Sequence, residues 1–464
     1  MKTPYSVEER SVLFVTTLTS FMGPFMISSV NVALPAIQKD FMMDAVQLSW
    51  VATAYLLAVA VGLLPAGKIG DIRGRKKVFV TGIAVYTIGA VLAAISNSAG
   101  FFIILRVFQG AGAALFVATG MAILTSVFPP QKRGRVIGIY VSAVYVGLSM
   151  GPFIGGFITQ QLGWRVIFWL MLPLGSLSFW LTMRYLKEEL QDESSEKLDL
   201  FGCLLYGTSI VFLVYGASKV PTAPGLVLLP LGLAGLLIFA YQQARSRYPV
   251  IELTLFRTNR VFAFSSYAAL LHYSATFGVT FLLSLYLQYI KGLSPQQAGM
   301  IIMAQPVMMA CFSPLAGRLS DYVEPRLLAS GGMFITAIGV FLFSRLSPDS
   351  VIPVIFINLI FLGIGFALFS SPNMSAMMGA VEKRHYGLAS GLVATMRLLG
   401  QMSSMAIVTV ILATKIGRSA TIESNLDQFL ASVQIAFILS ALLCLLGTYF
   451  SWYRGNVQRQ VEEK

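Results

Sequence analysis

Gly67-Lys-Ile-Gly-Asp71-Ile-Arg-Gly-Arg75-Lys-Lys77 is a short, glycine-spaced and strongly basic stretch between two long apolar segments. A polar connection this short predicts a loop that joins two membrane-crossing helices on one side of a bilayer. Because Lys and Arg of short loops are retained inside the cell, the loop is predicted to be cytoplasmic. A weaker copy, Pro314-Leu-Ala-Gly317-Arg-Leu-Ser-Asp321, follows in the second half of the chain. This recurrence predicts a duplicated transporter.

The composition of the chain also indicates a membrane protein. Its 464 residues are 56% hydrophobic and only 11% charged, whereas a soluble protein carries about 25% charged residues. The net charge of +13 is divided among alternate loops rather than gathered in one patch, which argues against nucleic-acid binding. The cysteines lie in apolar segments without a pairing pattern, and no metal site or cofactor is predicted.

Apolar segments long enough to cross a bilayer recur from end to end. An even number of crossings places both termini on one side, and most of the 33 Lys and Arg lie in loops on that side. Both termini are therefore predicted to be cytoplasmic, and the first segment is predicted to be a retained helix. The fourteen predicted spans cover approximately residues 11–36, 47–69, 77–98, 100–127, 135–161, 164–186, 199–219, 224–244, 261–290, 296–319, 327–346, 351–373, 387–414 and 427–452.

The distance between the two copies of the basic loop indicates an insertion. Asp71 ends the second span and Asp321 ends the tenth, whereas six-span repeats without an insertion would bring the copies closer together. A polar stretch, Gln191–Lys197, reads as a flexible linker. We therefore predict a six-helix unit over residues 1–190, a linker with two extra spans over 191–260, and a second six-helix unit over 261–464.

Three strings resemble motifs of one family. The opening loop fits the pattern G-x-x-x-D-x-x-G-R-[RK]-[RK]. Arg106-Val-Phe-Gln109-Gly110-Ala-Gly112-Ala-Ala resembles R-x-x-Q-G-x-G-A-A, and Gly147-Leu-Ser-Met-Gly151-Pro152-Phe-Ile-Gly155-Gly156 resembles G-x-x-x-G-P-x-x-G-G. Together with fourteen spans, these strings resemble the fourteen-helix drug:proton antiporter branch of the major facilitator superfamily. The resemblance implies an all-α polytopic fold of two six-helix bundles plus two helices, a monomer in a bacterial or archaeal inner membrane, and small-molecule export coupled to protons.

The basic loop has a functional and a simpler interpretation. The resemblance implies that Gly67, Asp71, Gly74 and Arg75 form a latch that holds the two halves in the outward-facing state. Since an acid near lipid is costly without a partner, Asp71 favours the latch. The simpler interpretation is a positively charged turn. In the second copy, Glu324 and Pro325 take the positions of Gly74 and Arg75, so any latch is asymmetric.

Two further motifs suggest roles in the transport cycle. Arg106 lies within the fourth span, where a cation needs a partner or a polar cavity. The resemblance implies that it controls proton coupling, together with Gln109, or contacts an anionic group. Snorkelling to the external interface is the alternative. The small residues of the fifth span predict close helix packing around a bend. They form a predicted hinge of Gly147, Gly151, Pro152, Gly155 and Gly156.

No Asp or Glu lies near the middle of a predicted span. The segment around Asn31 resembles D-x-T-x-x-N-x-A-L-P, but Met26 takes the acidic position, which weakens the case for dicationic substrates. The remaining group that titrates near neutral pH is His272 in the ninth span. A substrate or proton role and a core histidine bonded to a neighbouring hydroxyl are both open. The predicted coupling residues are Asp71, Arg106, Gln109 and His272.

Arg397 lies about three turns into the thirteenth span, in Gly387-Leu-Ala-Ser-Gly391-Leu-Val-Ala-Thr-Met-Arg397-Leu-Leu-Gly400. This string is similar to G-x-A-S-G-x-x-x-x-x-R-x-x-G of the same branch. We predict that Arg397 faces the substrate cavity; a structural bond to carbonyl groups is the alternative. The other predicted cavity residues are Asn31, Tyr55, Tyr145, His272, Tyr273, Gln288 and Gln305, with Asn373 as a further candidate.

The sequence predicts a secondary transporter that exports amphipathic, drug-like compounds by alternating access, driven by protons. An alternative is export of an anionic metabolite or lipid-like molecule, with coupling that does not use a mid-membrane carboxylate. The duplicated loop and the glycine-rich hinge argue against a static channel. No G-x-x-x-x-G-K-[ST] string supports a primary pump, and no cluster of His, Cys or acidic residues supports an enzyme.

Overall fold

The computed structural model describes residues 6–128, 130–186, 198–220, 222–246, 249, 254–381, 386–417 and 421–455. Within these ranges every regular element is a helix, and 14 helical segments are long and apolar enough to cross a membrane. This result confirms the predicted all-α polytopic fold and the number of spans. The predicted linker over Gln191–Lys197 lies outside the described residues.

The helices occur in the following order along the chain: α1 (Val7–Phe41), α2 (Ala45–Arg73), α3 (Arg75–Ala94), α4 (Ala99–Val127), α5 (Pro130–Gln161), α6 (Arg165–Trp169), α7 (Met171–Tyr185), α8 (Leu200–Lys219), α9 (Ala223–Gln243), α10 (Thr254–Thr258), α11 (Arg260–Leu285), η1 (Tyr286–Ile290), α12 (Pro295–Ile302), α13 (Ala304–Tyr322), α14 (Pro325–Phe343), α15 (Ile352–Gly379), α16 (Tyr386–Lys415) and α17 (Leu426–Tyr453). Three spans are made of two pieces each: α6 with α7, α11 with the π-helix η1, and α12 with α13.

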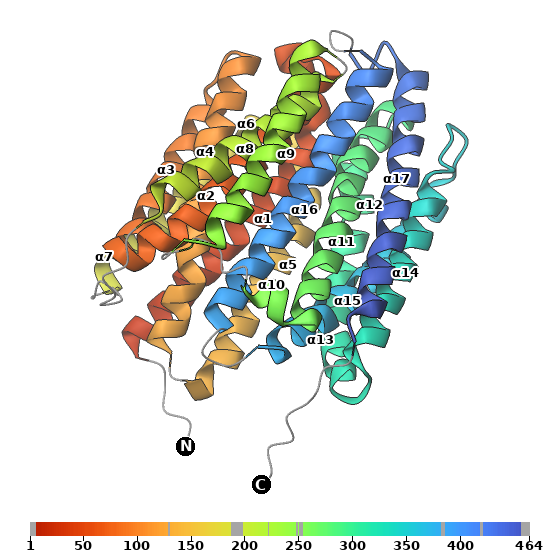
Figure 1. Cartoon of the computed structure of the whole chain (residues 1–464). Coiled ribbons are helices and arrows are strands. Elements are labelled where there is room, and N and C mark those ends of the chain that lie inside the picture. The colour runs from red at the N-terminus through yellow and green to blue at the C-terminus, as the bar shows by residue number, and fades with distance from the viewer. Residues whose placement is uncertain are drawn as a thin grey trace.

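The helices form two bundles with a hairpin beside them (Figure 1). In the N-bundle (α1–α7), α1 packs on α5 and α4 packs on both α2 and α3. In the C-bundle (α11–α17), α11 packs on α16 and α17, and α15 packs on α13 and α14. The hairpin of α8 and α9 contacts α2 of one bundle and α16 of the other. It is tied to α2 by Tyr206, whose Oη donates to the carbonyl of Ala60 over 3.3 Å.

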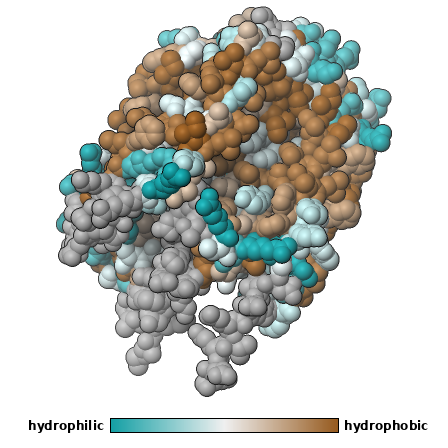
Figure 2. Space-filling model, in the orientation of Figure 1, coloured by the Kyte–Doolittle hydropathy of each residue, from teal (hydrophilic) through white to brown (hydrophobic). Residues whose placement is uncertain are grey.

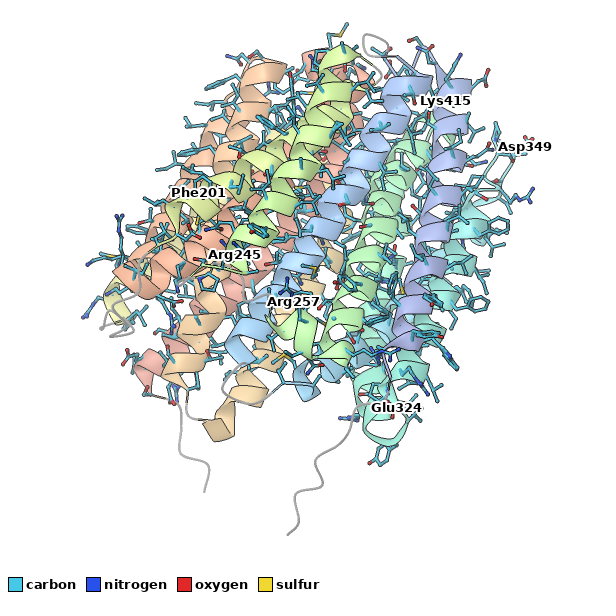
Figure 3. All side chains as sticks on the ribbon, viewed as in Figure 1. Phe201, Arg245, Arg257, Glu324, Asp349 and Lys415 are labelled. Atoms are coloured by element: carbon cyan, nitrogen blue, oxygen red, sulfur yellow. The ribbon has the colours of Figure 1, made fainter. Side chains whose placement is uncertain are left out.

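The molecule has two polar ends and an apolar middle. The first turn of α1 and the last turn of α17 lie at the same end, which we call the terminal side; the opposite end is the distal side (Figure 1). A broad hydrophobic belt covers the visible face between them (Figure 2). Asp349 and Lys415 lie toward the distal side and Glu324 lies at the terminal side (Figure 3). This distribution is the one expected for helices that cross a bilayer.

Local signals set several helix starts. Ser6 and Glu9 form a capping box at α1, Asp44 and Gln47 form one at α2, and Ser294 and Gln297 form one at α12. Each box satisfies two backbone N–H groups that have no partner within the helix. Between α2 and α3, Gly74 has a φ of 100°, a conformation that favours glycine. The basic loop therefore turns sharply at this glycine.

Candidate functional site

The two bundles are joined by polar contacts near the distal side. Ser284 Oγ of α11 donates to the carbonyl of Asn31 in α1 over 2.8 Å, and Gln288 Nε2 donates to the carbonyl of Val32 over 3.0 Å. Tyr289 Oη donates to Gln38 Oε1 nearby. Asn31 is closer to the distal end of α1 than to its start. These bonds therefore close the distal side.

A second polar contact closes the distal side between α2 and α16. Thr409 Oγ1 donates to Ser49 Oγ over 2.9 Å, and both side chains are buried. Ser49 lies in the second turn of α2, and Thr409 lies in the last turns of α16. Among the described residues, every hydrogen bond between the N-bundle and the C-bundle lies in the distal half. The two bundles thus meet where both spans approach the distal surface.

Pro35 explains why one carbonyl of α1 is available to the other bundle. Proline has no backbone N–H, so a proline inside a helix leaves the carbonyl four residues earlier without its usual partner. Pro35 lies inside α1, and the carbonyl that it leaves free is that of Asn31. Ser284 supplies the missing donor from α11. The same Asn31 has a buried side-chain Oδ1 without a partner among the described residues.

The glycines of α5 bring three helices into close contact. A Cβ added to Gly147 would lie 2.7 Å from the carbonyl oxygen of Phe21, and one added to Gly155 would lie 2.6 Å from Cα of Ser29. Both neighbours belong to α1. On another face, a Cβ on Gly156 would lie 2.4 Å from the carbonyl oxygen of Pro295 in the C-bundle. The small residues therefore allow α5 to pack on its own bundle and on the opposite one.

Gly151 and Pro152 complete this contact. Ser29 Oγ donates to the carbonyl of Gly151 over 2.9 Å, and a Cβ on Gly299 of α12 would lie 2.0 Å from the carbonyl oxygen of Pro152. A side chain at Gly151 or Gly299 would force the helices apart. A hinge role for the five residues stays a prediction: Gly147, Gly151 and Gly155 lie against α1, whereas Pro152 and Gly156 lie against α12 of the other bundle.

Arg397 lies at the middle of the membrane-spanning region, about 16 Å along α16 from its first residue. It is half-buried and is within electrostatic range of Tyr140 of α5 and Tyr273 of α11. Tyr145 of α5 is within the same range of Tyr273. The three tyrosines are also half-buried. These four side chains come from both bundles and form the central group.

Gly400 positions Arg397 within the central group. A Cβ added to Gly400 would lie 2.6 Å from the carbonyl oxygen of Leu270 and 2.7 Å from Cβ of Tyr273. The glycine therefore lets α16 lie directly against α11. A turn farther on, Ser404 Oγ accepts from the backbone N–H of Gly278 over 2.9 Å. Because Arg397 precedes Gly400 by one turn, this packing places its side chain beside Tyr273.

Arg106 is buried inside the N-bundle. Only 1% of the residue is exposed, so it does not snorkel to the membrane surface. Its Nε donates to the carbonyl of Val51 over 3.1 Å, and an Nη donates to Gln109 Oε1. The guanidinium lies 4.5 Å from the ring centre of Tyr55. Arg106 and Gln109 therefore lie together, and the Val51 carbonyl, Gln109 and Tyr55 are the partners that a cation at membrane depth requires.

His272 lies in the core of the C-bundle. Its ring centre is 4.2 Å from that of Phe369 and 4.6 Å from that of Phe366, both of α15. Neither ring nitrogen has a hydrogen-bond partner among the described residues. The alternative that a neighbouring hydroxyl satisfies this histidine is therefore wrong. Tyr273 beside it faces the central group instead, and a proton role for His272 stays a prediction.

The other predicted cavity residues fall into two places. Asn31 and Gln288 lie in the distal closure, whereas Tyr55 and Gln305 are buried within the walls of the bundles. The further candidate Asn373 bonds within the C-bundle, to the carbonyl of Ser265 over 3.1 Å. The structure thus brings together Tyr145, Tyr273 and Arg397 and leaves the others outside the central group.

The basic loop forms an ion pair within itself. Arg75 Nε and Nη2 donate to Asp71 Oδ1 over 2.9 and 2.8 Å. Lys76 Nζ donates to the carbonyl of Leu186, after the end of α7. Gly70 is tightly packed, since an added Cβ would lie 2.8 Å from Thr119, whereas Gly67 has open space. The partner of Asp71 among the described residues is thus the first residue of α3, across the turn at Gly74.

The sequence did not point to Tyr140, Ser284 or Tyr289. Tyr140 precedes Tyr145 in the same helix, so only its position in the fold shows that it joins the central group. Ser284 could have been sought through Pro35, because a proline inside a predicted span indicates a free carbonyl. Its donor could not have been named, since it lies in the opposite bundle.

The fold agrees with comparisons to known proteins. The sequence profile of the Major Facilitator Superfamily matches residues 16–402 and 265–464. The chain belongs to the Major Facilitator Superfamily. It is 30% identical to a riboflavin transporter of Clostridioides difficile (strain 630), over 94% of this chain and 95% of that protein. It is 31% identical to the multidrug resistance protein Stp of Mycobacterium tuberculosis (strain ATCC 25618 / H37Rv), over 89% and 78% of the two chains.

The fold also resembles solved structures. A bacterial homologue of the human lysosomal transporter Spinster, in an inward-facing and unoccupied conformation, superposes with a TM-score of 0.70. That match covers 97% of this chain and 98% of the other, at 16% identity. The superfamily member described here is therefore a multi-pass membrane transporter for small molecules and not an enzyme. The predicted superfamily and major facilitator fold are confirmed.

Proposed function

We propose that this transporter exports amphipathic small molecules by alternating access, driven by the proton gradient. The terminal side faces the cytoplasm, because most Lys and Arg lie in the loops of that side and such loops stay inside. We place the protein in the inner membrane of a prokaryote, because the relatives are bacterial proteins. Residues 1–190 and 261–464 form the moving units, with 191–260 between them. The transporter acts as a monomer.

The observation that carries this proposal is the position of the contacts between the bundles. The bonds from Ser284 to Asn31 and from Thr409 to Ser49 lie in the distal half, whereas the central group is half-buried between the bundles. In a two-bundle transporter, rocking of one bundle against the other moves access from one side to the other. The arrangement fits a state that is closed distally and loads substrate from the cytoplasm.

Export of drug-like compounds is supported by two features. The motif strings of α4 and α5 resemble those of drug:proton antiporters, and a relative is a multidrug resistance protein. Aromatic side chains in the central group suit amphipathic compounds with ring systems, because ring pairs contribute about 0.5–1.5 kcal/mol beyond their buried area.

Proton coupling is proposed to use the groups at or near the membrane interior. Among described residues, each acid lies in a loop or in the first or last turns of a helix, so a mid-membrane carboxylate is not part of the route. Asp71 is the acid of the basic loop, and we propose that its ion pair with Arg75 changes when the distal side opens. Arg106 with Gln109, and His272, are the remaining coupling candidates.

A cross-link across the distal closure tests alternating access. The native Cys203, Cys311 and Cys444 are replaced by alanine, and Ser49→Cys and Thr409→Cys are introduced together. Oxidation is expected to stop transport of an amphipathic dye into inside-out vesicles, and a reductant is expected to restore it. Dissipating the pH gradient in the reduced protein is expected to stop transport as well.

A matched pair within one bundle provides the control. Ser330 and Ser451 bond to each other over 3.0 Å in the C-bundle, so the pair Ser330→Cys and Ser451→Cys joins two helices that move together. Its oxidation should leave transport unchanged. Full transport by the protein cross-linked between positions 49 and 409 would contradict alternating access about this closure.

A further inference from the structure

Arg397 is a cation at membrane depth that bonds to no other residue which the structure describes. Among the described residues, no side chain or carbonyl bonds to it and no acid lies beside it. A charged group within a membrane protein normally pairs with another group or lines a polar cavity. The unpaired guanidinium of the central group therefore has all of its donors available to a ligand.

The surroundings of Arg397 belong to both bundles. Tyr140 and Tyr145 come from α5, whereas Tyr273 and Arg397 come from the C-bundle. Tyr140 is held in place from its own bundle, because Ser20 Oγ of α1 donates to its carbonyl over 3.0 Å. Tyr273 is held by the contact of Gly400 with α11. A ligand in the central group therefore touches elements that separate when the bundles rock.

The chemistry of these side chains selects a class of ligand. A guanidinium offers a planar set of donors that matches the two oxygens of a carboxylate or the oxygens of a phosphate or sulfonate. Tyrosine rings provide apolar faces, and their hydroxyl groups can donate to an anion. A cationic ligand would meet the like charge of Arg397 without a nearby carboxylate to compensate.

We propose that Arg397, Tyr140, Tyr145 and Tyr273 bind an aromatic anion, with the guanidinium on the anionic group and the tyrosines on the ring system. This inference rests on the proposed export function and assigns the substrate charge that the family does not specify. Because the four residues come from both bundles, the anion bridges them during the transport cycle. Export would then carry aromatic carboxylates, phosphates or sulfonates rather than aromatic cations.

Three fluorescent probes with one ring system test the charge preference. They are 1-pyrenebutyrate, its neutral amide, and 4-(1-pyrenyl)butyltrimethylammonium, measured with the purified full-length protein in neutral detergent. The wild type is expected to bind the carboxylate at least about tenfold more tightly than the amide, the amount that one charged hydrogen-bonded contact contributes. The ammonium probe is expected to bind most weakly.

Variants of the arginine assign this preference to one residue. Arg397→Met is expected to weaken carboxylate binding at least about tenfold and to change amide binding less than about threefold. Arg397→Lys keeps the charge but loses the planar set of donors, so its carboxylate affinity should lie between those of the wild type and Arg397→Met. Arg345→Met is the matched control, because Arg345 is exposed near the distal surface; it should leave all three affinities unchanged.

Several results would overturn the inference. Equal loss of carboxylate and amide binding in Arg397→Met would show a structural role, and a wild-type preference for the ammonium probe would assign the opposite charge. The wild-type order decides the question even if Arg397→Met does not fold. If Arg397→Met weakens the binding of added phosphatidylglycerol but not the binding of any probe, the anion is a lipid headgroup and the substrate assignment fails.

The test separates this inference from the proposed function. Gradient-driven movement of the amide or ammonium probe, with no effect of Arg397→Met, would keep the exporter and remove the anion site. Arg397-dependent binding of the carboxylate, with no gradient-driven movement of any probe, would keep the anion site and remove the exporter.

Discussion

Arg106 and Arg397 are both arginines within membrane-spanning helices, but their surroundings differ. Arg106 is 1% exposed and bonds to Val51 and Gln109, with Tyr55 against its guanidinium. Arg397 is half-buried between the bundles and has no bond to a described residue. The first arginine is held by one bundle, whereas the second faces the space that both bundles share.

This difference shows how a buried cation can be structural or functional. The partners of Arg106 offset the cost of taking its charge out of water, so removing the side chain leaves those partners unsatisfied. In the part of the chain that the structure describes, Arg397 has no such partners to leave behind. The free-energy cost of holding the Arg397 charge within the membrane is offset only when water or a ligand contacts the guanidinium. The comparison therefore predicts opposite effects of the same substitution on stability and on binding.

The largest effect on stability is expected for Arg106→Met. The change leaves Gln109 Oε1 without its donor and removes the additional donor to the Val51 carbonyl in the core of the N-bundle, which should cost about 3 kcal/mol. The measurement is thermal unfolding of the purified protein in detergent. Arg345→Met serves as the control for loss of an exposed arginine. A melting temperature equal to that of the control would contradict a structural role for Arg106.

The bond between Ser284 and Asn31 predicts that the effect of Ser284→Ala depends on Pro35. Ser284→Ala leaves the Asn31 carbonyl without a donor and should favour distal opening by about 1 kcal/mol. In a Pro35→Ala protein, the backbone N–H at position 35 can bond to that carbonyl, so Ser284→Ala should have an effect below about 0.5 kcal/mol. Unlike either arginine, Ser284 makes a contact with the opposite bundle, and this contact exists only while the distal side is closed.

The distance between spin labels on the two sides of the distal opening measures the effect of Ser284→Ala in each background. Met42→Cys and Asp349→Cys lie on exposed distal loops of the two halves, in a protein whose native cysteines are replaced by alanine. The fraction of long distances should rise with Ser284→Ala alone. An equal rise in the Pro35→Ala background would show that the proline does not provide the free carbonyl.

Asp71→Asn should affect transport more than stability. The ion pair of Asp71 with Arg75 is partly exposed, with 40% of the Asp71 side chain accessible, so its loss should change stability by less than about 0.5 kcal/mol. If the loop is a latch between conformations, transport should fall about fivefold or more. Uptake of a dye by inside-out vesicles measures transport. Unchanged uptake with a normal yield of folded protein would remove the latch.

The smallest effect concerns Asp199 at the start of the hairpin. Burial tends to raise the pKa of this carboxyl, but bonds from Gln242, Gly202 and Gln243 lower it below its ordinary value. Because the folded pKa is the lower one, the carboxylate stabilises the fold above the ordinary pKa and this gain is lost as the pH falls through the lowered pKa. The group is partly exposed, so solvent screens it and the gain is under about 0.5 kcal/mol.

A comparison with Asp199→Asn isolates this contribution. Thermal unfolding of both proteins is measured between about pH 3 and 7, around the usual range for aspartate. The wild type should be slightly more stable at the upper end, and the difference should vanish at the lower end. A difference that grows as the pH falls would have the wrong sign and would contradict the assigned hydrogen bonds.

The sequence predicts the membrane fold well because single segments carry the signal. Each apolar run is long enough to cross a bilayer, and the basic loop around Asp71 indicates the side. Interruptions of a helix within a span are harder to predict from the sequence. The π-helix over Tyr286–Ile290 and the junction at Met303 between α12 and α13 depend on how these helices meet the N-bundle, which hydropathy does not contain.

The site is predicted only in part because it depends on pairs of distant residues. Arg397 was identified because an arginine deep in a span needs an explanation. Whether Arg106 is a partnered cation depends on its contacts with Val51 and Gln109. Whether His272 is hydrogen-bonded depends on the presence of a hydroxyl group beside it. Tyr140 and Ser284 gain their roles from the opposite helix. Such contacts arise from packing between segments that are far apart in the chain.

The most direct test of the difference between the two arginines measures stability and binding on the same preparations of Arg106→Met and Arg397→Met. Arg106→Met is expected to lower the free energy of unfolding by about 3 kcal/mol, whereas Arg397→Met is expected to change it by less than about 0.5 kcal/mol and to lose at least about tenfold in affinity for 1-pyrenebutyrate. Equal destabilisation of both variants, with unchanged carboxylate preference in the folded fraction of Arg397→Met, would show that the two arginines do not differ in role.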